Sequence, residues 1–457
     1  SLKAAVTDSD PNKFKWDAAI DGLATKVETF IEDQLRPGTY KANSAPITVN
    51  GTQLATISDS DTAVVDYALT ATGYGSGWVS MIFGNGKAFT PDYSVYAEYT
   101  AFEHKEAARL TGQRLYLEPT ASFPMEWAAG FVRPTVGYQS ISYNLDSPFG
   151  NAGNDSPSVA APMASLDTGM FFERDTEFLG TRFQQTLEPR AFYLWVDRQD
   201  HSDIPNFDSQ DLTFTFSQLF RTTRFAGHDR IADANQASFS LTSRLIDEAS
   251  GREVLNASIG QIRYFENRRV TIANTVAAVQ SQSDSAIAAE VQAQPGDALS
   301  VTASTLWDPQ RAQVDEGGMM VHWTPGTDTI LNLGYRYRRD QPLVDPRGFV
   351  SIEDIDQVDF STSLPLAQNW QLLARYQYDL TNDTSLEETT GIEYSSCCWA
   401  LRVVYQEGVD WNKGRDRGVY MEFVLRGLGS LGKNIDQLLQ KSIFGYGQPD
   451  PEPGLVY

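Results

Sequence analysis

Apolar and polar residues alternate with a period of two along most of the chain, beginning at about residue 92. The clearest examples are 329–338, 370–379 and 418–426. In 329–338 the apolar positions are Leu331, Leu333, Tyr335 and Tyr337, and the polar positions are Asn332, Gly334, Arg336 and Arg338. In 418–426 the apolar positions are Val419, Met421, Phe423 and Leu425. Side chains alternate across a β-strand, so each segment is predicted to be a strand with one apolar and one polar face.

Two all-β architectures produce this alternation. A soluble antiparallel sandwich has one face in its core and one in water. An outer-membrane barrel has a lipid-facing and a lumen-facing side, and its tilted strands need about ten residues to cross the bilayer. The long segments, the charged residues in mid-strand and the aromatic residues at the segment ends favour a transmembrane antiparallel β-barrel of the outer-membrane type. Long polar loops at 340–352 and 407–417, against a short turn at 366–368, fit the same architecture.

The first 90 residues follow a different pattern. Apolar residues recur at helical spacing over 16–35, and Asn50-Gly51 lies between two short apolar stretches, as in a hairpin. We interpret 1–90 either as a small α+β module or as a divergent start of the barrel. The barrel is then expected over 91–446, and 447–457 form a C-terminal tail.

Composition narrows the function. The formal net charge of −23 argues against binding to nucleic acid, which needs clustered Lys and Arg. The apolar fraction is 41% and the aromatic fraction 12%, which suits strands that are apolar on one face only. No signal peptide is apparent, so an exported protein is expected here in a mature or truncated form. The sequence shows no nucleophile and base arrangement, and we predict no enzymatic activity, no cofactor and no metal site.

Two local motifs are candidates for function. Cys397 and Cys398 are adjacent and are the chain's two cysteines. Neighbouring cysteines rarely bridge each other, so they are either buried thiols or partners of cysteines elsewhere. The second motif is a polar stretch, 220–236, which is either a loop tied by its own ion pairs or one that folds into a lumen and gates it. Its candidate residues are Arg221, Arg224, Asp229, Arg230, Asp233, Asn235 and Gln236.

Pro189 lies within a predicted strand, Gln185–Ala191. Because proline cannot donate a ladder hydrogen bond, it predicts a bulge or a kink at this position.

Several stretches resemble one known family. They are Phe171–Asp175, Gln185–Ala191, Leu219–Arg221, Gly227–Gln236, Thr242–Leu245, Gly260–Ile262, Tyr394–Arg402 and Leu425–Leu428. In order and spacing they resemble the barrel portion of the outer-membrane LptD proteins of lipopolysaccharide (LPS) assembly, over residues 92–446. The sequence departs from the family at His228, where a bulky residue such as Tyr is expected, and it lacks the family's periplasmic domain with its cysteines. About 16–18 strands are predicted after residue 92, against about 26 in the family.

The resemblance implies an LPS translocon in the outer membrane of a Gram-negative cell. LPS would pass through the lumen and a lateral gate whose wall is the strand bearing Val419, Met421, Phe423 and Leu425. The family's plug lipoprotein, LptE, would fill the lumen, and the periplasmic bridge protein LptA would dock on a preceding domain. Cys397 and Cys398 would each bond a cysteine of that domain. The alternative is a passive porin or nutrient channel, which needs neither the plug nor the cysteines.

Overall fold

The computed structural model describes residues 46–49, 52–56, 63–72, 74–83, 91–104, 109–146, 154–178, 180–272, 279–326, 328–344, 350–410 and 414–447. The helix expected at 16–35 lies outside these residues. The expected hairpin is confirmed, because β1 (Pro46–Val49) pairs antiparallel with β2 (Thr52–Thr56). Among the helices described, none has the length and apolarity needed to cross a membrane.

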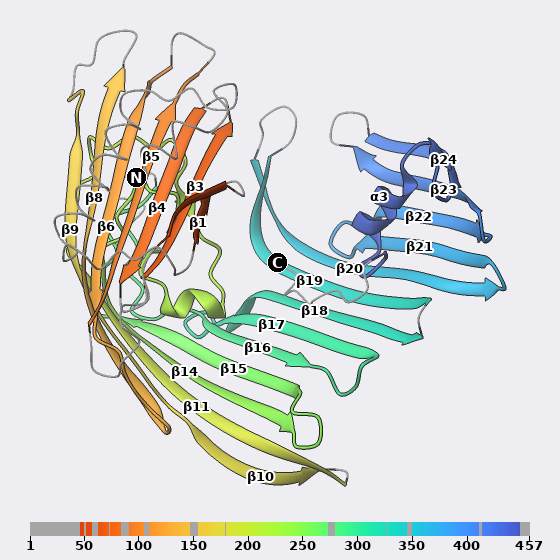
Figure 1. Cartoon of the computed structure of the whole chain (residues 1–457), viewed down its shortest axis with the longest axis horizontal. Helices are drawn as coiled ribbons and strands as arrows, with labels where there is room; N and C mark the ends of the chain where they lie inside the picture. Colours follow the sequence, from red (N-terminus) through yellow and green to blue (C-terminus); the bar gives the residue numbers. More distant parts are fainter. Residues whose placement is uncertain are drawn as a thin grey trace. The chain divides into compact units, whose positions relative to one another are not determined.

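β-Strand makes up most of the described secondary structure (Figure 1). The elements after β2 are β3 (Ala63–Thr72), β4 (Tyr74–Phe83), β5 (Asp92–Phe102), β6 (Thr111–Ser122), β7 (Met125–Trp127), β8 (Gly130–Asp146), β9 (Ser158–Met170), β10 (Phe172–Phe178), β11 (Thr181–Val196), β12 (Gln210–Asp211), the 3-10 helix η1 (Phe216–Phe220), β13 (Phe225–Ala226), β14 (Ala234–Asp247), β15 (Glu253–Tyr264), β16 (Ile287–Ala293), β17 (Leu299–Asp308), β18 (Gln313–Gly326), β19 (Thr329–Val344), β20 (Val350–Ala367), β21 (Trp370–Asp379), β22 (Thr384–Ser395), β23 (Trp399–Asp410), β24 (Gly414–Leu425), β25 (Gly429–Gly432) and the helix α3 (Ile435–Ser442). The predicted all-β fold is confirmed.

The described residues divide into two compact units. The first comprises the chain up to Phe171 together with Pro189–Phe239 and Ile262–Asp284, and the second comprises Phe172–Glu188, Ser240–Gln261 and the chain from Ser285 onward. In the first unit, β3, β4, β5, β6, β8 and β9 pair in this order, and β9 then pairs with the C-terminal half of β11. β14 to β25 pair in chain order, and all of these strands lie in the second unit except the start of β14 and the end of β15, which belong to the first. Every strand pair with a described register is antiparallel, as expected of an outer-membrane barrel.

β4 pairs with β5 over Phe83↔Tyr93 to Ser76↔Thr100. Strands of the ladder therefore lie before residue 91. For 63–83 this pairing favours the interpretation as the start of a barrel. The role of the other residues before 91, and the boundary at residue 90 itself, stay predictions. From β5 to β24, leaving out the short β7, β12 and β13 and counting β10 as the continuation of β9, 16 described strands remain, in line with the expected number.

The pairing of β11 with its neighbours is interrupted at Pro189, where the sequence predicted a bulge or a kink. β11 pairs with β10 up to Leu187↔Phe172 and with β9 from Arg190↔Gly169. Glu188 and Pro189 fall between these two ladders. The proline, which has no N–H, therefore lies at the break between the two ladders on this edge of β11.

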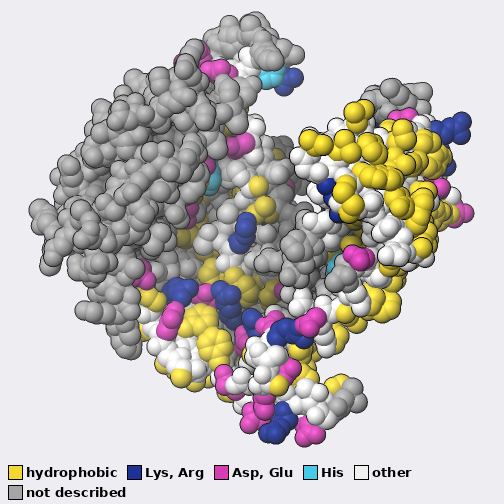
Figure 2. All heavy atoms as spheres, turned by 45° about the vertical axis from the view of Figure 1, so that its right-hand side comes forward, with side chains coloured by type: hydrophobic (Ala, Val, Ile, Leu, Met, Phe, Trp, Pro, Cys, Tyr) yellow, Lys and Arg dark blue, Asp and Glu magenta, His cyan; other side chains and the backbone are white. Residues whose placement is uncertain are grey.

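The predicted faces of the strands are confirmed. In β19, Leu333 and Tyr335 are exposed while Asn332 is buried, and Arg338 on the polar face donates to Glu316 at 2.7 Å. In β24, Val419, Met421, Phe423 and Leu425 are all exposed, and Glu422 on the opposite face is 3% exposed. Figure 2 shows the apolar side chains as a broad surface over strands of the second unit. Exposed apolar faces of this size require a lipid or protein environment.

The expected long loops are shorter than predicted. At 340–352, β19 runs to Val344 and β20 begins at Val350, and at 407–417 β23 runs to Asp410 and β24 begins at Gly414. Within each polar segment the two sides pair with one another and extend the hairpin, for example through Val409↔Arg415. Polarity did not predict this backbone pairing. A short turn is present, but it lies later than the predicted 366–368, because β20 runs to Ala367 and β21 begins at Trp370; Asn369 in this turn has φ 71°.

The second unit has a helix on its polar face. Ile435 and Leu439 of α3, with Ile443 after it, are fully buried against Leu373 and Val404. The segment is also held by polar contacts, since Asn332 donates to the Phe444 carbonyl at 3.0 Å and Tyr446 to Glu393 at 3.1 Å. Leu373 and Val404 are apolar residues on polar faces, and this helix explains why they are there.

Candidate functional site: the 197–233 loop and the last long strand

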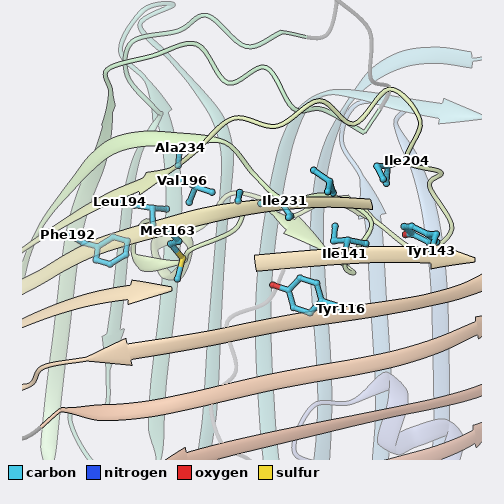
Figure 3. Packing of buried hydrophobic residues seen from close by; sticks show 12 residues of the cluster. Tyr116, Ile141, Tyr143, Met163, Phe192, Leu194, Val196, Ile204, Ile231 and Ala234 are labelled. Carbon is cyan, nitrogen blue, oxygen red and sulfur yellow. The ribbon is translucent and has the colours of Figure 1, made fainter. Parts of the chain in front are cut away.

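The polar 220–236 stretch belongs to a longer loop, residues 197–233, which joins β11 to β14. It packs on the buried face of strands in the first unit. Ile204 and Ile231 of the loop join a cluster with Ile141, Tyr143 and Leu194 of β8 and β11, and Phe207 stacks on Phe102 at 4.3 Å between ring centroids. Figure 3 shows the loop residues lying over these strands.

Asp229 anchors the loop to the strands. Its side chain is fully buried, and its Oδ2 accepts backbone N–H groups of Phe207, Asp208 and Ser209 at 2.9, 2.8 and 3.0 Å. Burial alone raises the pKa of Asp229, but the charge of Arg114 and the hydrogen bonds from Tyr143 and the backbone outweigh burial. The pKa therefore lies below its usual value, and the loop is held by an ionised carboxylate.

Arg114 of β6 is the partner of Asp229 on the strands. It is 1% exposed and donates to Asp229 at 2.5 Å, to Asp208 at 2.6 and 2.8 Å and to Glu98 at 2.8 Å. Three carboxylates thus surround one guanidinium. His228, at the position where the family resemblance predicted a bulky residue, lies 3.2 Å from Glu98 through Nδ1 and stacks on Tyr116 at 4.1 Å. The histidine therefore fills an aromatic position and also adds a hydrogen-bonding group.

A second set of ion pairs and hydrogen bonds joins the loop to the segment after β15. Arg224 donates to the Asp233 carbonyl and carboxylate, both at 2.7 Å, and to the Val270 carbonyl. Asp233 also accepts the backbone N–H groups of Arg269 at 2.7 Å and Val270 at 3.1 Å. Arg230 donates to the Pro205 and Asp229 carbonyls at 2.8 and 2.9 Å. These ion pairs and hydrogen bonds hold the loop in one position on the strands.

The remaining predicted residues lie elsewhere. Arg221 is exposed, and Gln236 is buried on β14. Asn235 is on the other face of β14, where it donates to Glu266 at 2.7 Å and accepts from Tyr193 at 3.0 Å. It is therefore separate from the Arg114 network. This follows from the strand period, because β14 begins at Ala234 and neighbouring residues point to opposite faces.

Sequence reasoning missed Arg114, Glu98, Asp208 and His201. A signal existed for Arg114, a charged residue in the middle of a strand, but two of its partners, Asp208 and Asp229, come from a loop 94 and 115 residues away. Periodicity carries no information about such distant pairs.

The last long strand, β24, has two different edges. One edge pairs with β23 over its whole length, from Gly414↔Asp410 to Leu425↔Trp399. Within the described residues of the second unit, the other edge pairs only over Glu422–Leu425, with the short β25. Most of this edge is thus without a strand partner in its unit.

The two cysteines lie in the turn between β22 and β23. Both are exposed, and neither forms a disulfide within the part of the chain that the structure describes; their sulfur atoms are 2.7 Å apart. The contact with Cys398 and that with Ser396 lower the pKa of Cys397. A thiol with a lowered pKa is more often the reactive thiolate.

Comparison with known proteins decides the family. The sequence model described as LPS transport system D (LptD) matches residues 83–370. The LPS-assembly protein LptD of Nitrosococcus oceani is 38% identical over 361 residues, which are 78% of this chain and 46% of that protein. This chain belongs to the LptD family. The proteins of the same name from Xanthomonas campestris pv. campestris and Pseudomonas syringae pv. syringae are 38% and 35% identical, over 74% of this chain and 42% and 41% of theirs.

The chain spans less than half the length of these LptD relatives. As a member of the LptD family with this strand architecture, it is an outer-membrane β-barrel protein. Among solved structures, the siderophore receptor PirA from Acinetobacter baumannii aligns with a TM-score of 0.32 and 8% identity, over 83% of this chain and 69% of that one. A likeness this weak adds nothing to the family assignment.

His201 makes the attachment of the loop sensitive to pH. It is 1% exposed, and its Nε2 accepts the Ile231 N–H at 3.1 Å, so this nitrogen must be unprotonated. Burial lowers the pKa of His201 to about 4; the charge of Arg230 adds to this, and the Gln199 carbonyl, Asp233 and Asp200 oppose it. The ordinary pKa is about 6.5. The unfolded loop therefore binds more protons below that pH, and stability is lost as the pH falls toward 4.

We predict that this loss reaches about 2 kcal/mol by about pH 5. Hydrogen exchange of the Ile231 amide, corrected for its intrinsic rate, should show lower protection at about pH 5 than at about pH 7. In His201→Gln, whose amide oxygen still accepts this N–H, protection should change little, and amides of β23 serve as an internal control. Equal pH dependence in the wild type and the variant would contradict the assignment to His201.

Proposed function

We propose that this chain is the barrel of an outer-membrane LPS translocon, which inserts LPS into the outer leaflet through its lumen and a lateral gate. The assignment of LPS as the cargo is supported by the relatives, which are named LPS-assembly proteins. The proposal of a gate is supported by one edge of β24, which pairs over only four described residues in its unit, Glu422–Leu425. Each backbone group that loses its partner in lipid costs several kcal/mol. A strand with few pairs on one edge therefore opens at the lowest cost.

We assign the partners from the family and the polar surfaces. The plug lipoprotein LptE would contact the polar faces of the strands, where Arg375 is held by Asp359 and Glu387 at 2.6 and 2.9 Å. The bridge protein LptA would deliver LPS through a domain outside these 457 residues. The role is transport rather than catalysis.

The gate is tested by mapping where LPS leaves the full-length protein in cells. A photoreactive amino acid at Met421, exposed on β24, should form several-fold more LPS adducts than one at Leu333, exposed on the same kind of face in β19. The reason is that cargo crosses only at the strand that parts. Heat-modifiable migration on gels checks that both variants are folded.

Equal adducts at the two positions would place the exit elsewhere. An absence of LPS adducts at both positions, in folded protein, would favour the passive channel.

We further propose that Cys397 and Cys398 each bond a cysteine of the preceding domain in the full-length protein. Their exposure in the β22–β23 turn supports this, as does the absence of other cysteines in these 457 residues. Exported proteins generally keep cysteines oxidised. Mass spectrometry of non-reduced peptides from cells should find each joined to a distant peptide. Free thiols, or a bridge between Cys397 and Cys398, in mature protein would show the assignment to be wrong.

The 197–233 loop is proposed to block the passage of solutes. Arg114→Gln removes the cation from three carboxylates, and breaking a buried pair in this way costs about 3–5 kcal/mol. We expect faster protease cleavage within 197–233 and greater entry of a large antibiotic that the outer membrane normally excludes. The matched control is Arg133→Gln, which removes an exposed pair with Glu126 at 2.7 Å and is expected to change neither reading. Faster cleavage without greater entry would mean that the loop does not block the passage.

A further inference from the structure

A pocket of about 250 Å³ lies in the first unit where β11 ends and β14 begins. Its walls come from residues 195–198, 233–235 and 266–269. The pocket is below the range of about 300–1,000 Å³ that holds a drug-sized ligand, so it suits a small polar group. It is distinct from the Arg114 network, because its lining residues include neither Arg114 nor the carboxylates that Arg114 contacts.

Two cations in the pocket have no counterion. Arg198 and Arg269 are exposed, and among the described residues neither side chain makes a hydrogen bond or an ion pair. Arg198 is only attracted at longer range to Asp200. The third lining arginine, Arg268, is different because it is buried and donates to Gln280 at 2.9 Å. The pocket therefore presents two guanidinium groups that are free to bind an anion.

Two anions in the pocket have no cation among the residues that the structure describes. There, Asp197 accepts the Gln199 amide at 2.8 Å, and Glu266 accepts the Asn235 amide at 2.7 Å. Asp233 is different because Arg224 pairs with it at 2.7 Å. With two free cations and two free anions, the pocket is poorly suited to a simple phosphate. It is complementary to a group that carries both charges.

Exposed aromatic side chains place the pocket at the membrane surface. Trp195 is 36% exposed and Phe265 is 55% exposed, and the Tyr193 ring lies 6.4 Å from that of Phe265. Trp and Tyr gather at the level of lipid headgroups in membrane proteins. Trp195 also offers an indole face, which attracts an ammonium group.

We propose that this pocket binds the headgroup of an outer-membrane lipid that carries both a phosphate and a primary amine. Arg198 and Arg269 hold the phosphate by charge-assisted hydrogen bonds. Asp197, Glu266 and the Trp195 ring hold the ammonium. The inference requires only the outer-membrane location and does not depend on LPS export, so it can fail without affecting the proposed function.

The test uses the full-length protein in detergent and native mass spectrometry with added lipids. Phosphatidylethanolamine should be retained in preference to phosphatidylglycerol, which lacks the amine. The double variant Arg198→Ala/Arg269→Ala should lose about tenfold in retention, the loss expected from two charge-assisted contacts. The matched control is Arg263→Ala, whose guanidinium is already paired with Asp284 at 2.6 Å and should not affect binding.

A second variant separates recognition from folding. Asp197→Asn/Glu266→Gln removes the negative charges, so the preference should shift toward phosphatidylglycerol while the total retention of lipid remains. Unfolding cannot produce such a reversal. Equal retention of both lipids by the wild type would overturn the proposal, as would full retention by the arginine variant. Displacement of the lipid by inorganic phosphate at similar concentration would also overturn it, since it would indicate a simple anion site.

Discussion

The backbone hydrogen bond between neighbouring strands is the interaction on which this structure depends. In a bilayer no water can replace it, so every N–H and C=O in the membrane must find a partner within the protein. This requirement explains why the sequence keeps a period of two over so much of its length. It also explains where irregularities occur. Pro189 lies between two ladders, and β24 keeps a complete ladder on one edge while pairing over only four residues on the other within its unit.

Once the strands are paired, other segments of the chain pack on their polar faces. In the first unit this segment is the 197–233 loop, held by the buried Arg114 and Asp229. In the second unit it is α3 and the residues after it, with Leu439 buried on Leu373 and Val404. Both segments combine apolar packing with charged groups. A buried ion pair is weak evidence for stability, because desolvation offsets much of the attraction. The several partners of Arg114 instead define one position for the loop.

The sequence predicted the faces of the strands well and the segments that pack on them poorly. The alternation of Val419, Met421, Phe423 and Leu425 is a local property, because the strand period alone determines it. The position of Arg114 among Glu98, Asp208 and Asp229 depends on a loop that returns from more than 90 residues away. Leu373 and Val404 interrupt the polar faces of β21 and β23, and this was the available signal for α3. The hairpin extensions at 340–352 and 407–417 were missed because polar composition predicts exposure rather than pairing.

The contacts around Arg402 bear on where a seam could open. Arg402 of β23 pairs with Glu393 of β22 at 2.8 Å, with Glu422 of β24 at 3.1 Å and with Asp436 of α3 at 3.1 Å. One side chain thus joins three neighbouring strands and the helix on their polar face. Parting β23 from β24 would break a full ladder together with the ion pair between Arg402 and Glu422. Parting β24 at its other edge breaks neither, so the proposed opening belongs at that edge, with β22, β23, β24 and α3 moving as one body.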